Sequence, residues 1–348
     1  MQAYLANTGV AMRGRKVHSG GMQTTSDIHV VLGAGQIGSL LAQRLLALGH
    51  RVRQVRRGPA GAPAPGLEWW SGDLSDAAFA AEAMAGASVA YQCVCPPYHR
   101  WPQELPQLVR GTVEGAARSG AKLVVLDNLY AYGKPAGPID EETRQNPCSK
   151  KGELRARLAD EMLAAHRSGD ARIVLGRASD FFGPGITLAS IFGERYYRRV
   201  LAGKAGETFG DGSMPHTYSY GPDVAEGLRL LGTRDDVLGK VWLLPASVSE
   251  STAASLEHMA RALGVRTSVS KVPTFVLRAL GLFVPAMAEM VEMVYQWEVP
   301  YVVSDARFSR TFGVAATPAA RAFHDTASWA LARFSKRGVQ SAAASAHP

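Results

Sequence analysis

Residues 28–38 read IHVVLGAGQIG, and this stretch decides the fold. Its first five residues are a short apolar run, as expected of a parallel strand that is buried on both faces. The six residues that follow hold three glycines with the spacing GxGxxG. A helix is predicted next, because Leu41, Leu45 and Leu48 recur on one helical face. A second strand is predicted over Arg51–Val55, so the segment has the order and length of a βαβ unit.

The glycine motif predicts a turn that binds a dinucleotide. Gly33 permits the tight turn, Gly35 lets the backbone approach a pyrophosphate, and Gly38 lets helix and strand pack closely. Gln36 and Ile37 complete the turn at the start of the helix, where free N–H groups and a partial positive charge favour phosphate. The motif alone is a weak signal, and a glycine turn without a ligand is the alternative. The strand before it and the helix after it favour a bound dinucleotide.

The end of the second predicted strand indicates which dinucleotide. A site for NAD usually places an acidic residue about 20 residues beyond the glycines, where it binds the ribose hydroxyls. Here Arg56 and Arg57 occupy that region, with no acidic residue beside them. Because an arginine pair suits a 2′-phosphate, NADP(H) is favoured. NAD(H) stays open if one arginine only stacks on adenine.

Strand and helix patterns alternate through the first half of the chain. Strands are predicted at Ser88–Cys93, Leu123–Leu126, Ile173–Leu175 and Val241–Leu244, and helices at Pro106–Ser119 and Glu153–His166. This alternation predicts an α/β fold with a Rossmann-type doubly wound parallel sheet. Beyond residue 180 the pattern loosens, which predicts a smaller, mostly helical C-terminal substrate lobe over the carboxyl ends of the strands.

The expected organisation has two interleaved parts. The dinucleotide-binding domain spans 27–180, with later returns near 218–250, and the substrate lobe takes most of 181–333. Residues 1–26 contain no acidic residue and no apolar run, so a disordered leader is expected there, with Met22 as an alternative start. A disordered tail is expected over 334–348.

Composition limits the class of partner. The 38 Lys and Arg residues exceed the 30 Asp and Glu residues by eight, but they are spread along the chain and no nucleic-acid motif accompanies them. We therefore expect an anionic small ligand, no nucleic acid and, because charges interrupt the most apolar stretch at 276–297, no membrane span. Cys93, Cys95 and Cys148 lack metal-ligand spacing, so no metal is expected. Their odd number fits the cytoplasm.

Four later motifs carry a resemblance to a known family. They are GDL at 72–74, VLDNLYAYG at 125–133, RASDFFGPG at 177–185 and YSYGPDV at 218–224. In this order they resemble the motifs of the extended short-chain dehydrogenase/reductase superfamily, which contains nucleotide-sugar epimerases and dehydratases. The similarity covers roughly residues 28–330, and the chain looks most like an atypical branch.

The resemblance implies roles for several residues. Asp73 and Leu74 correspond to residues that contact adenine. Asn128 stands where the family has the Ser or Thr that polarises a substrate carbonyl, and its amide can donate to a carbonyl oxygen. The catalytic YxxxK motif corresponds to KGELR, so that Lys151 stands in place of the tyrosine and Arg155 in place of the lysine.

The altered catalytic motif leaves the proton donor open. Lys151 and Arg155 are four residues apart and share one face of a predicted helix. By the resemblance this face lies toward nicotinamide, where Arg155 would bind the ribose and its charge would make Lys151 a readier proton donor. The alternative is that both bind only ribose or solvent. Tyr130 and Tyr132 are rival donors, with a place in the core or the pocket wall as the alternative for each.

Two other segments receive lesser roles. The aromatic residues of Tyr98–Trp101 follow a predicted strand and are candidates for the wall of a substrate pocket. His216 precedes Tyr218 in a later loop and is interpreted as structural or exposed, because a lone histidine is more often structural or exposed than catalytic.

These observations predict an NADP(H)-dependent oxidoreductase that transfers hydride to or from the carbonyl or alcohol of a small, partly aromatic or apolar molecule. A nucleotide-sugar epimerase or dehydratase is the alternative among enzymes, and the missing tyrosine weighs against it. A non-catalytic NADP(H)-binding sensor is the alternative from another class. The expected partner is a small-molecule substrate, and a homodimer is compatible with this interpretation.

Overall fold

A computed structural model describes residues 28–210, 212–273, 275–277 and 285–335. The expected leader lies outside the described residues, as do residues 336–348 of the expected tail. The first residue of that tail, Phe334, instead ends helix α11 (Ala319–Phe334). Its ring stacks on Tyr197, with 5.6 Å between the ring centroids, so the ordered lobe extends at least this far.

The centre of the molecule is a seven-stranded parallel sheet in the order β10-β6-β5-β4-β1-β2-β3. Its strands are β1 (Ile28–Leu32), β2 (Arg51–Arg56), β3 (Leu67–Ser71), β4 (Ala87–Gln92), β5 (Lys122–Asp127), β6 (Ile173–Arg177) and β10 (Val241–Leu243). The strand order reverses between β1 and β4, which places a crevice at their carboxyl ends. The expected doubly wound α/β fold is therefore confirmed.

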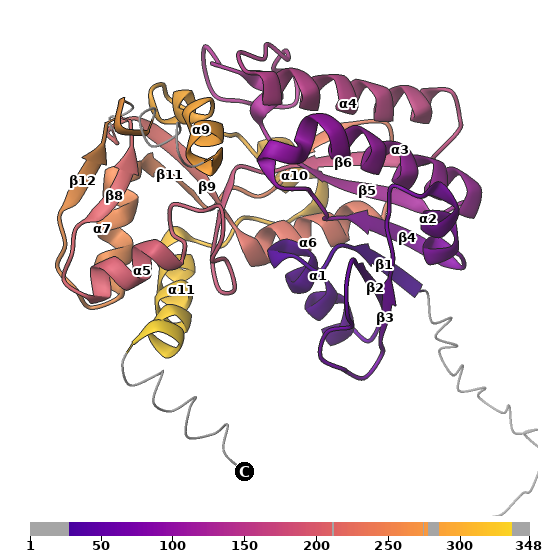
Figure 1. The fold of residues 1–348 in the computed structure, drawn as a ribbon, viewed down its shortest axis with the longest axis horizontal. Coiled ribbons are helices and arrows are strands. Elements are labelled where there is room, and N and C mark those ends of the chain that lie inside the picture. The colour runs from indigo at the N-terminus through magenta and orange to yellow at the C-terminus, as the bar shows by residue number, and fades with distance from the viewer. Residues whose placement is uncertain (1–27, 211, 274, 278–284, 336–348) are drawn as a thin grey trace, which may run out of the picture.

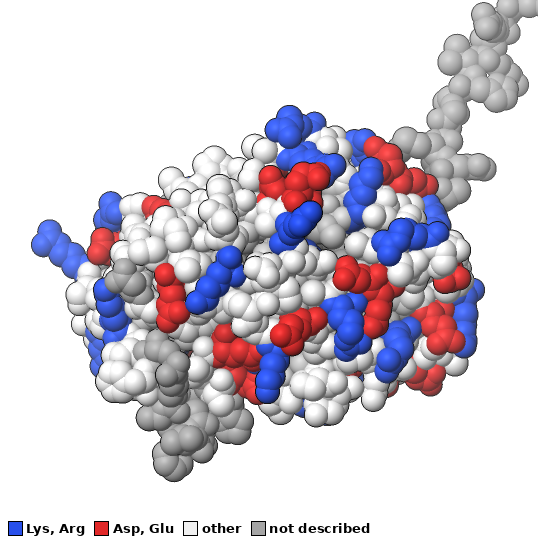
Figure 2. Space-filling view, turned by 90° about the horizontal axis from the view of Figure 1, so that it is seen from above, with Lys and Arg blue, Asp and Glu red and all other residues white. Residues whose placement is uncertain are grey.

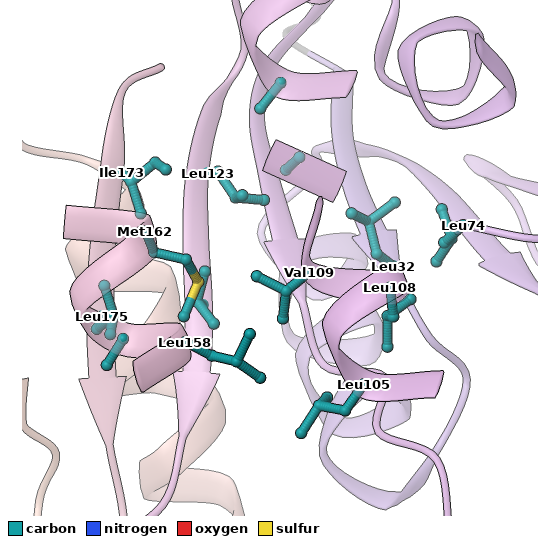
Figure 3. Packing of buried hydrophobic residues seen from close by; sticks show 14 of the residues in the cluster. Leu32, Leu74, Leu105, Leu108, Val109, Leu123, Leu158, Met162, Ile173 and Leu175 are labelled. Atoms are coloured by element: carbon teal, nitrogen blue, oxygen red, sulfur yellow. The ribbon is translucent and has the colours of Figure 1, made fainter. Parts of the chain in front are cut away.

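Helices cover both faces of this sheet (Figure 1). One face carries α2 (Ala77–Met84), α3 (Trp101–Ser119) and α4 (Lys150–Arg167); the other carries α1 (Gln36–Ala47), α6 (Gly221–Gly232) and α10 (Ala306–Phe312). Strand β1 is apolar except for His29, whose ring nitrogen lies 3.1 Å from the Tyr91 hydroxyl, because the strand is buried on both sides. Val30 and Leu32 pack in the first layer and Val31 in the second. Figure 3 shows the first layer, where α3 and α4 lie against β5 and β6 through Leu105, Val109, Leu158, Met162, Leu123 and Ile173.

Several element boundaries differ from those predicted. Helix α3 begins at Trp101 and α4 at Lys150, each a few residues before the expected start. Helix α4 begins there because the Ser149 hydroxyl accepts a hydrogen bond from the backbone N–H of Gly152 at 3.0 Å. The sequence did not indicate β3, because this edge strand is only half-buried and lacks a continuous apolar run.

The C-terminal lobe contains two small sheets as well as helices. Strands β7 (Asp180–Phe182), β9 (Pro215–Tyr220) and β11 (Val248–Ser251) form one, and β8 (Gly206–Phe209) pairs with β12 (Val269–Val272) in the other. Helices α5 (Glu194–Leu201) and α7 (Thr252–Ala262) pack with α11 around an aromatic core. Helix α9 (Pro285–Val291) and the 3-10 turn η3 (Val294–Trp297) bring the chain back toward the crevice. Strands this short give little sequence periodicity, which is why a mostly helical lobe was expected here.

Charges of both signs are interspersed on the face seen in Figure 2. Among the helices that the structure describes, none combines the length and apolarity needed to cross a membrane.

Candidate active site

The glycine turn joins β1 to α1 and packs against the end of β4. Gly33 has φ +119°, a conformation that side chains rarely adopt, and a Cβ there would lie 2.9 Å from the backbone nitrogen of Val94. A Cβ on Gly38 would lie 2.3 Å from the carbonyl oxygen of Gly33. Gly35 differs, because a Cβ there would meet no atom within 4 Å and the residue lines a cavity. The turn is thus closed toward the sheet and open where a phosphate at the start of α1 would lie.

This difference predicts opposite effects for two alanine substitutions. Gly38→Ala forces the backbone of the turn to move, and we expect a loss of about 1–3 kcal/mol in the free energy of unfolding. Gly35→Ala places its methyl in open space, so the stability should stay at the wild-type value while the affinity for NADPH falls. Chemical denaturation and NADPH titration of both variants measure these effects. Equal destabilisation by the two substitutions would contradict this account of the turn.

Two cavities meet at the glycine turn. The inner cavity, of about 490 Å³, lies over the carboxyl ends of β1, β4 and β5 and is lined by residues that include Asn128 and Asp180. The outer cavity, of about 380 Å³, lies at the ends of β2 and β3 and is lined by residues that include Arg56 and Asp73. Both are lined by Gly33, Ala34, Val94 and Pro96. This arrangement fits an extended dinucleotide whose pyrophosphate lies at the junction, over the start of α1.

The outer cavity carries a positive charge. Arg56 and Arg57 line it and are both exposed, as is Arg100 at the start of α3. Glu104 lies 3.8 Å from a guanidinium nitrogen of Arg57 and also pairs with Arg100, whereas no ion pair joins Arg56 to another described residue. Three arginines, Glu104 and Asp73 therefore line the end of the site where a ribose 2′-phosphate is expected.

Asp73 and Leu74 border the outer cavity on the side of β3. The Asp73 carboxylate accepts hydrogen bonds from the backbone N–H and the hydroxyl of Ser75, both at 2.9 Å. The backbone hydrogen bond is the main reason that the pKa of Asp73 lies below its ordinary value. Leu74 is buried in the first core layer and forms the base of this part of the cavity.

The inner cavity is largely apolar, with a few polar groups at its wall. Asn128 follows β5, and its side-chain oxygen accepts a hydrogen bond from the backbone N–H of Tyr130 at 3.1 Å. The hydroxyls of Tyr130 and Tyr98 are 2.6 Å apart. Burial is the main cause that raises the pKa of Tyr130 well above its ordinary value. Burial also raises the pKa of Tyr98 to about 12. Tyr98 and Trp101 line this cavity, in the place the sequence suggested for them.

Beneath the cavity lies a buried group of three charges. The Asp127 carboxylate pairs with Arg155 at 3.0 Å and with Arg177 at 2.8 Å, and all three side chains are at most 9 % exposed. Burial alone would raise the pKa of Asp127, but the two arginines hold it below its ordinary value. Arg155 lines the inner cavity, and its Nε is buried without a partner among the described residues. The guanidinium carbon lies 5.2 Å from the centroid of the Trp101 ring, and the expected contact of Arg155 with a ribose stays a prediction.

Lys151 and Arg155 do not share the cavity as the sequence suggested. Only Arg155 is among the residues that line it. Lys151 stands in the first turn of α4, where its ammonium pairs with Glu289 and Glu292. Glu292 also accepts a hydrogen bond at 2.9 Å from the backbone N–H of Lys151. These carboxylates come from a segment about 140 residues away. The ammonium also lies 5.5 Å from the centroid of the Tyr98 ring, which lines the cavity, so Lys151 stands behind the cavity wall.

Two further candidates have structural contacts. Tyr132 is buried with its ring 4.8 Å from the guanidinium carbon of Arg177, and it is not among the residues that line either cavity. Gln36 lines the inner cavity, but its amide holds a neighbouring loop. Its oxygen accepts from the backbone N–H groups of Thr187 and Leu188 at 2.5 and 2.7 Å, and its nitrogen donates to the carbonyl of Leu188 at 3.0 Å. Ile37 lines the cavity beside it.

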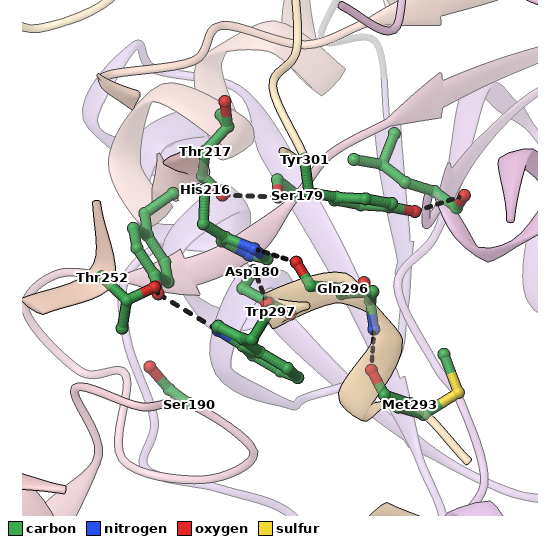
Figure 4. A network of polar contacts seen from close by, with 12 residues as sticks. Ser179, Asp180, Ser190, His216, Thr217, Thr252, Met293, Gln296, Trp297 and Tyr301 are labelled. Carbon is green, nitrogen blue, oxygen red and sulfur yellow. Dashed lines mark hydrogen bonds and ion pairs between the residues drawn. The ribbon is translucent and has the colours of Figure 1, made fainter. Parts of the chain in front are cut away.

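Sequence reasoning missed one pair at this site. Asp180 lines the inner cavity, and its carboxylate lies 2.9 Å from Nε2 of His216, which is completely buried on β9. Figure 4 shows this contact within a wider polar network. The one signal in the sequence was Asp180 itself, which stands where the superfamily motif RxxNxYGPG has asparagine.

Solved structures of similar fold cover nearly the whole chain. A dTDP-glucose 4,6-dehydratase double mutant from Streptomyces venezuelae, with NAD bound, gives a TM-score of 0.72 at 18 % identity over 90 % of this chain and 98 % of that one. A UDP-glucuronic acid 4-epimerase from Bacillus cereus in complex with NAD gives a TM-score of 0.70 at 16 % identity, over 87 % of this chain and 96 % of that one. MoeE5 in complex with UDP-glucose and NAD gives a TM-score of 0.69 at 22 % identity, over 89 % of this chain and 100 % of that one. At these identities the likeness shows the fold.

The family is shown by the sequence comparison. A comparison with curated protein sequences found no match. The family model described as "NAD dependent epimerase/dehydratase family" matches residues 29–243, which include the glycine turn, Asn128, Arg155 and Asp180. This match confirms, at the level of the family, the expected nicotinamide-dependent enzyme. The chain therefore belongs to the NAD-dependent epimerase/dehydratase family, within the extended short-chain dehydrogenase/reductase superfamily.

Proposed function

We propose that this protein is an NADP(H)-dependent oxidoreductase that reduces a carbonyl, or oxidises the corresponding alcohol, of a small apolar or aromatic molecule. The observation that carries this proposal is the contrast between the two joined cavities. The outer one is lined by three arginines, and the inner one is mainly apolar with hydrogen-bonding groups on one side.

The outer cavity supports a cofactor with a 2′-phosphate. Arg56 forms no ion pair with another described residue, and Arg57 has a long contact of 3.8 Å with Glu104 and a weaker electrostatic interaction with Asp73. A phosphate between these guanidinium groups would receive charge-assisted hydrogen bonds, whereas a free ribose hydroxyl would meet no acceptor from them. When bound, the cofactor supplies or accepts the hydride.

The inner cavity supports an uncharged substrate. Arg155 is the one cationic side chain among the described residues that line it, and it already pairs with Asp127, which also pairs with the buried Arg177. Asp180 adds a carboxylate to the wall. A diphosphate would therefore find one guanidinium group, which is already paired with a carboxylate, and a second carboxylate in the same wall. Aromatic and aliphatic side chains make up much of the remaining lining, including Tyr98, Trp101, Leu126, Leu129, Phe181 and Leu188.

Asn128 and Tyr130 are the groups that we assign to the carbonyl oxygen. The backbone of Tyr130 holds the side-chain oxygen of Asn128, so the amide nitrogen of Asn128 remains to donate toward the cavity. Tyr130 shares one hydrogen bond with Tyr98, which leaves the pair one hydroxyl proton to donate to a ligand. Donors held in place before the reaction stabilise the negative charge that develops on a carbonyl oxygen.

A nucleotide-sugar epimerase or dehydratase is the second candidate. Family membership favours it, and solved structures of similar fold include enzymes whose titles name dTDP-glucose and UDP-sugar substrates or ligands. The charges of the inner cavity, and Lys151 where the superfamily has its catalytic tyrosine, weigh against it.

Cofactor oxidation distinguishes the two candidates. We expect the purified protein to oxidise NADPH in the presence of benzaldehyde or phenanthrenequinone, used as apolar carbonyl probes. Asn128→Ala should slow this reaction by about 10²–10³-fold, the usual cost of losing one such donor. UDP-glucose is the matched probe for the alternative. Conversion of UDP-glucose together with inactivity toward both carbonyl probes would refute the proposed function.

A further inference from the structure

We propose that Asp180 and His216 together hold the proton that a carbonyl substrate takes up, with Asp180 as the acid that contacts the substrate. This inference rests on the proposed function and deepens it. His216 acts through Asp180 and is a positioning residue.

The contacts of the His216 ring place an extra proton on the pair. Its Nε2 lies 2.9 Å from a carboxylate oxygen of Asp180, and its Nδ1 lies 3.1 Å from the carbonyl oxygen of Gln296 (Figure 4). A carbonyl oxygen only accepts, so Nδ1 carries a hydrogen when this hydrogen bond forms. Nε2 then either carries a second hydrogen beside a carboxylate or accepts one from a protonated carboxyl group. In both cases the pair holds one proton more than a neutral imidazole beside a carboxylate.

Loss of this proton has a structural cost. A neutral ring that kept its hydrogen on Nε2 would turn the lone pair of Nδ1 toward the Gln296 oxygen, and two acceptors would face each other at 3.1 Å. The site is buried, so water does not relieve that contact. His216 is 0 % exposed, and its hydrogen-bonding groups have the contacts just described.

Aromatic rings around His216 also favour its charged form. The rings of Trp297 and Tyr301 lie nearly parallel to it, at 5.2 and 5.7 Å between centroids, and Tyr218 lies at 4.7 Å. Aromatic faces attract a desolvated cation. Asp180 connects this buried ring to the ligand site, because its side chain is 20 % exposed and lines the inner cavity. The proton is thus protected at His216 and accessible at Asp180.

The other titratable groups around the pair hold their protons tightly. They are five tyrosines from five segments of the chain. Burial is the main cause that raises the pKa of each above its ordinary value, and the charge of Asp180 adds to that effect: Tyr98 in the 3-10 turn η1 (Tyr98–Arg100), Tyr130 in the 3-10 turn η2 (Tyr130–Tyr132), Tyr218 in β9, Tyr295 in η3 and Tyr301 beyond it. The nearby charged group, Asp127 with Arg155 and Arg177, is engaged in its own ion pairs. The tyrosines are therefore suited to donate hydrogen bonds, which leaves the Asp180–His216 pair as the group at this wall to deliver the proton.

The step balances as follows in reduction. The carbonyl carbon gains a hydride from NADPH, and the carbonyl oxygen gains the proton of the pair. The new O–H bond forms while the bond that held this proton breaks, leaving neutral His216 beside the Asp180 carboxylate. Solvent restores the proton after the alcohol leaves. Reduction therefore slows as pH rises and the pair loses its proton, and oxidation of an alcohol speeds up over the same range.

The protonation state can be measured without turnover. Full-length protein with ¹⁵N-labelled histidine reports which ring nitrogens carry hydrogen, and the spectrum of His216→Gln identifies the His216 signals. We expect a hydrogen on Nδ1 of His216 at neutral pH, as both protonated arrangements require. A bare Nδ1 would overturn the inference, whatever the enzyme does with any substrate.

Transfer of the proton is tested by single-turnover oxidation of NADPH with phenanthrenequinone across pH. Asp180→Asn keeps the size of the side chain but cannot carry the proton, so the rate should fall by about 10²–10⁴-fold and lose its decline at high pH. Its affinity for NADPH should stay at the wild-type value. Asp180→Glu retains a carboxyl group and should retain the pH dependence. The matched control is Glu250→Gln, which alters an acid–histidine pair with His258 at 2.8 Å that lies away from both cavities.

The outcomes separate this inference from the proposed function. An active wild type together with an Asp180→Asn variant of equal rate and equal pH dependence overturns the inference and leaves the proposed function standing. A wild type that binds NADPH but reduces neither carbonyl probe overturns the proposed function, and proton transfer to a carbonyl with it. The ring-nitrogen spectra still decide in that case whether Nδ1 of His216 carries the hydrogen that the inference requires.

Discussion

Asp127→Asn is expected to lower the free energy of unfolding by about 3–5 kcal/mol, as breaking a buried ion pair does elsewhere. The carboxylate pairs with both Arg155 and Arg177, and the side chain of Arg177 is 1 % exposed. Asparagine has nearly the same shape but no charge, so two buried guanidinium groups would lose their counter-ion. Nη2 of Arg177 already has no hydrogen-bond partner among the described residues, so little is available to compensate.

Guanidinium chloride denaturation measures this effect as a shift in the unfolding midpoint. The comparison holds when the dependence of the unfolding free energy on denaturant concentration is the same in both proteins. Glu161→Gln is the matched control, because it removes a carboxylate from an exposed ion pair with Arg157 on α4. Exposed pairs contribute little, so this control should unfold near the wild-type midpoint. Equal midpoints for the two variants would show that the buried charges are not the source of stability.

The pH dependence of stability follows from the same carboxylate. The pKa of Asp127 is lowered in the folded protein, because the arginines outweigh the effect of burial. Its contribution is therefore present above the unfolded-state value, which is about 3.9, and is lost as pH falls through the lower folded-state value. Wild type should lose stability in acid over this range, and Asp127→Asn should lose less.

Replacing Arg56 and Arg57 together by alanine is expected to weaken NADPH binding by about 10²-fold. In a closed site, each guanidinium group would contribute about 1.5–3 kcal/mol to binding through a charge-assisted hydrogen bond to the 2′-phosphate. Because both arginines are exposed, we expect their combined contribution near the lower end of that range, which corresponds to about 10²-fold in affinity. NADH lacks that phosphate, so its affinity should change little. The wild type should accordingly bind NADPH more tightly than NADH.

Titrations of both cofactors on wild type and variant test this prediction. Arg51→Ala is the matched control, because Arg51 is an equally exposed arginine at the opposite end of the same strand. It should leave both affinities unchanged. A wild type with equal affinities for NADPH and NADH would remove the argument from these arginines, and a similar loss for both cofactors in the double variant would assign them to another part of the dinucleotide.

Much of the fold could be predicted because it depends on short-range patterns. The apolar run of β1, the glycine spacing and the leucines of α1 lie within about twenty residues, and backbone geometry restricts what such a pattern can form. The places of Arg56 and Arg57 followed from the same unit, because the end of β2 lies beside the glycine turn in any βαβ unit of this kind. Glycine conformations and apolar periodicity act locally, so the chain itself carries them.

The chemistry of the inner cavity depended on contacts between distant segments. Four-residue spacing placed Lys151 and Arg155 on one face of α4, but Glu289 and Glu292 hold Lys151 elsewhere. The sequence motifs contained Asp127 and Arg177 without indicating that they pair across neighbouring strands.

His216 shows the same limit most clearly. In the sequence it is one histidine before a tyrosine. In the structure Asp180, 36 residues before it, and Gln296, 80 residues after it, contact its two ring nitrogens. The sequence by itself determined the sheet, the cofactor turn and the arginines beside it. Only the tertiary structure decided which ionisable groups are buried together, because the protonation of a side chain is set by burial and by neighbouring charges, and these come from strands and turns that meet only when the chain folds.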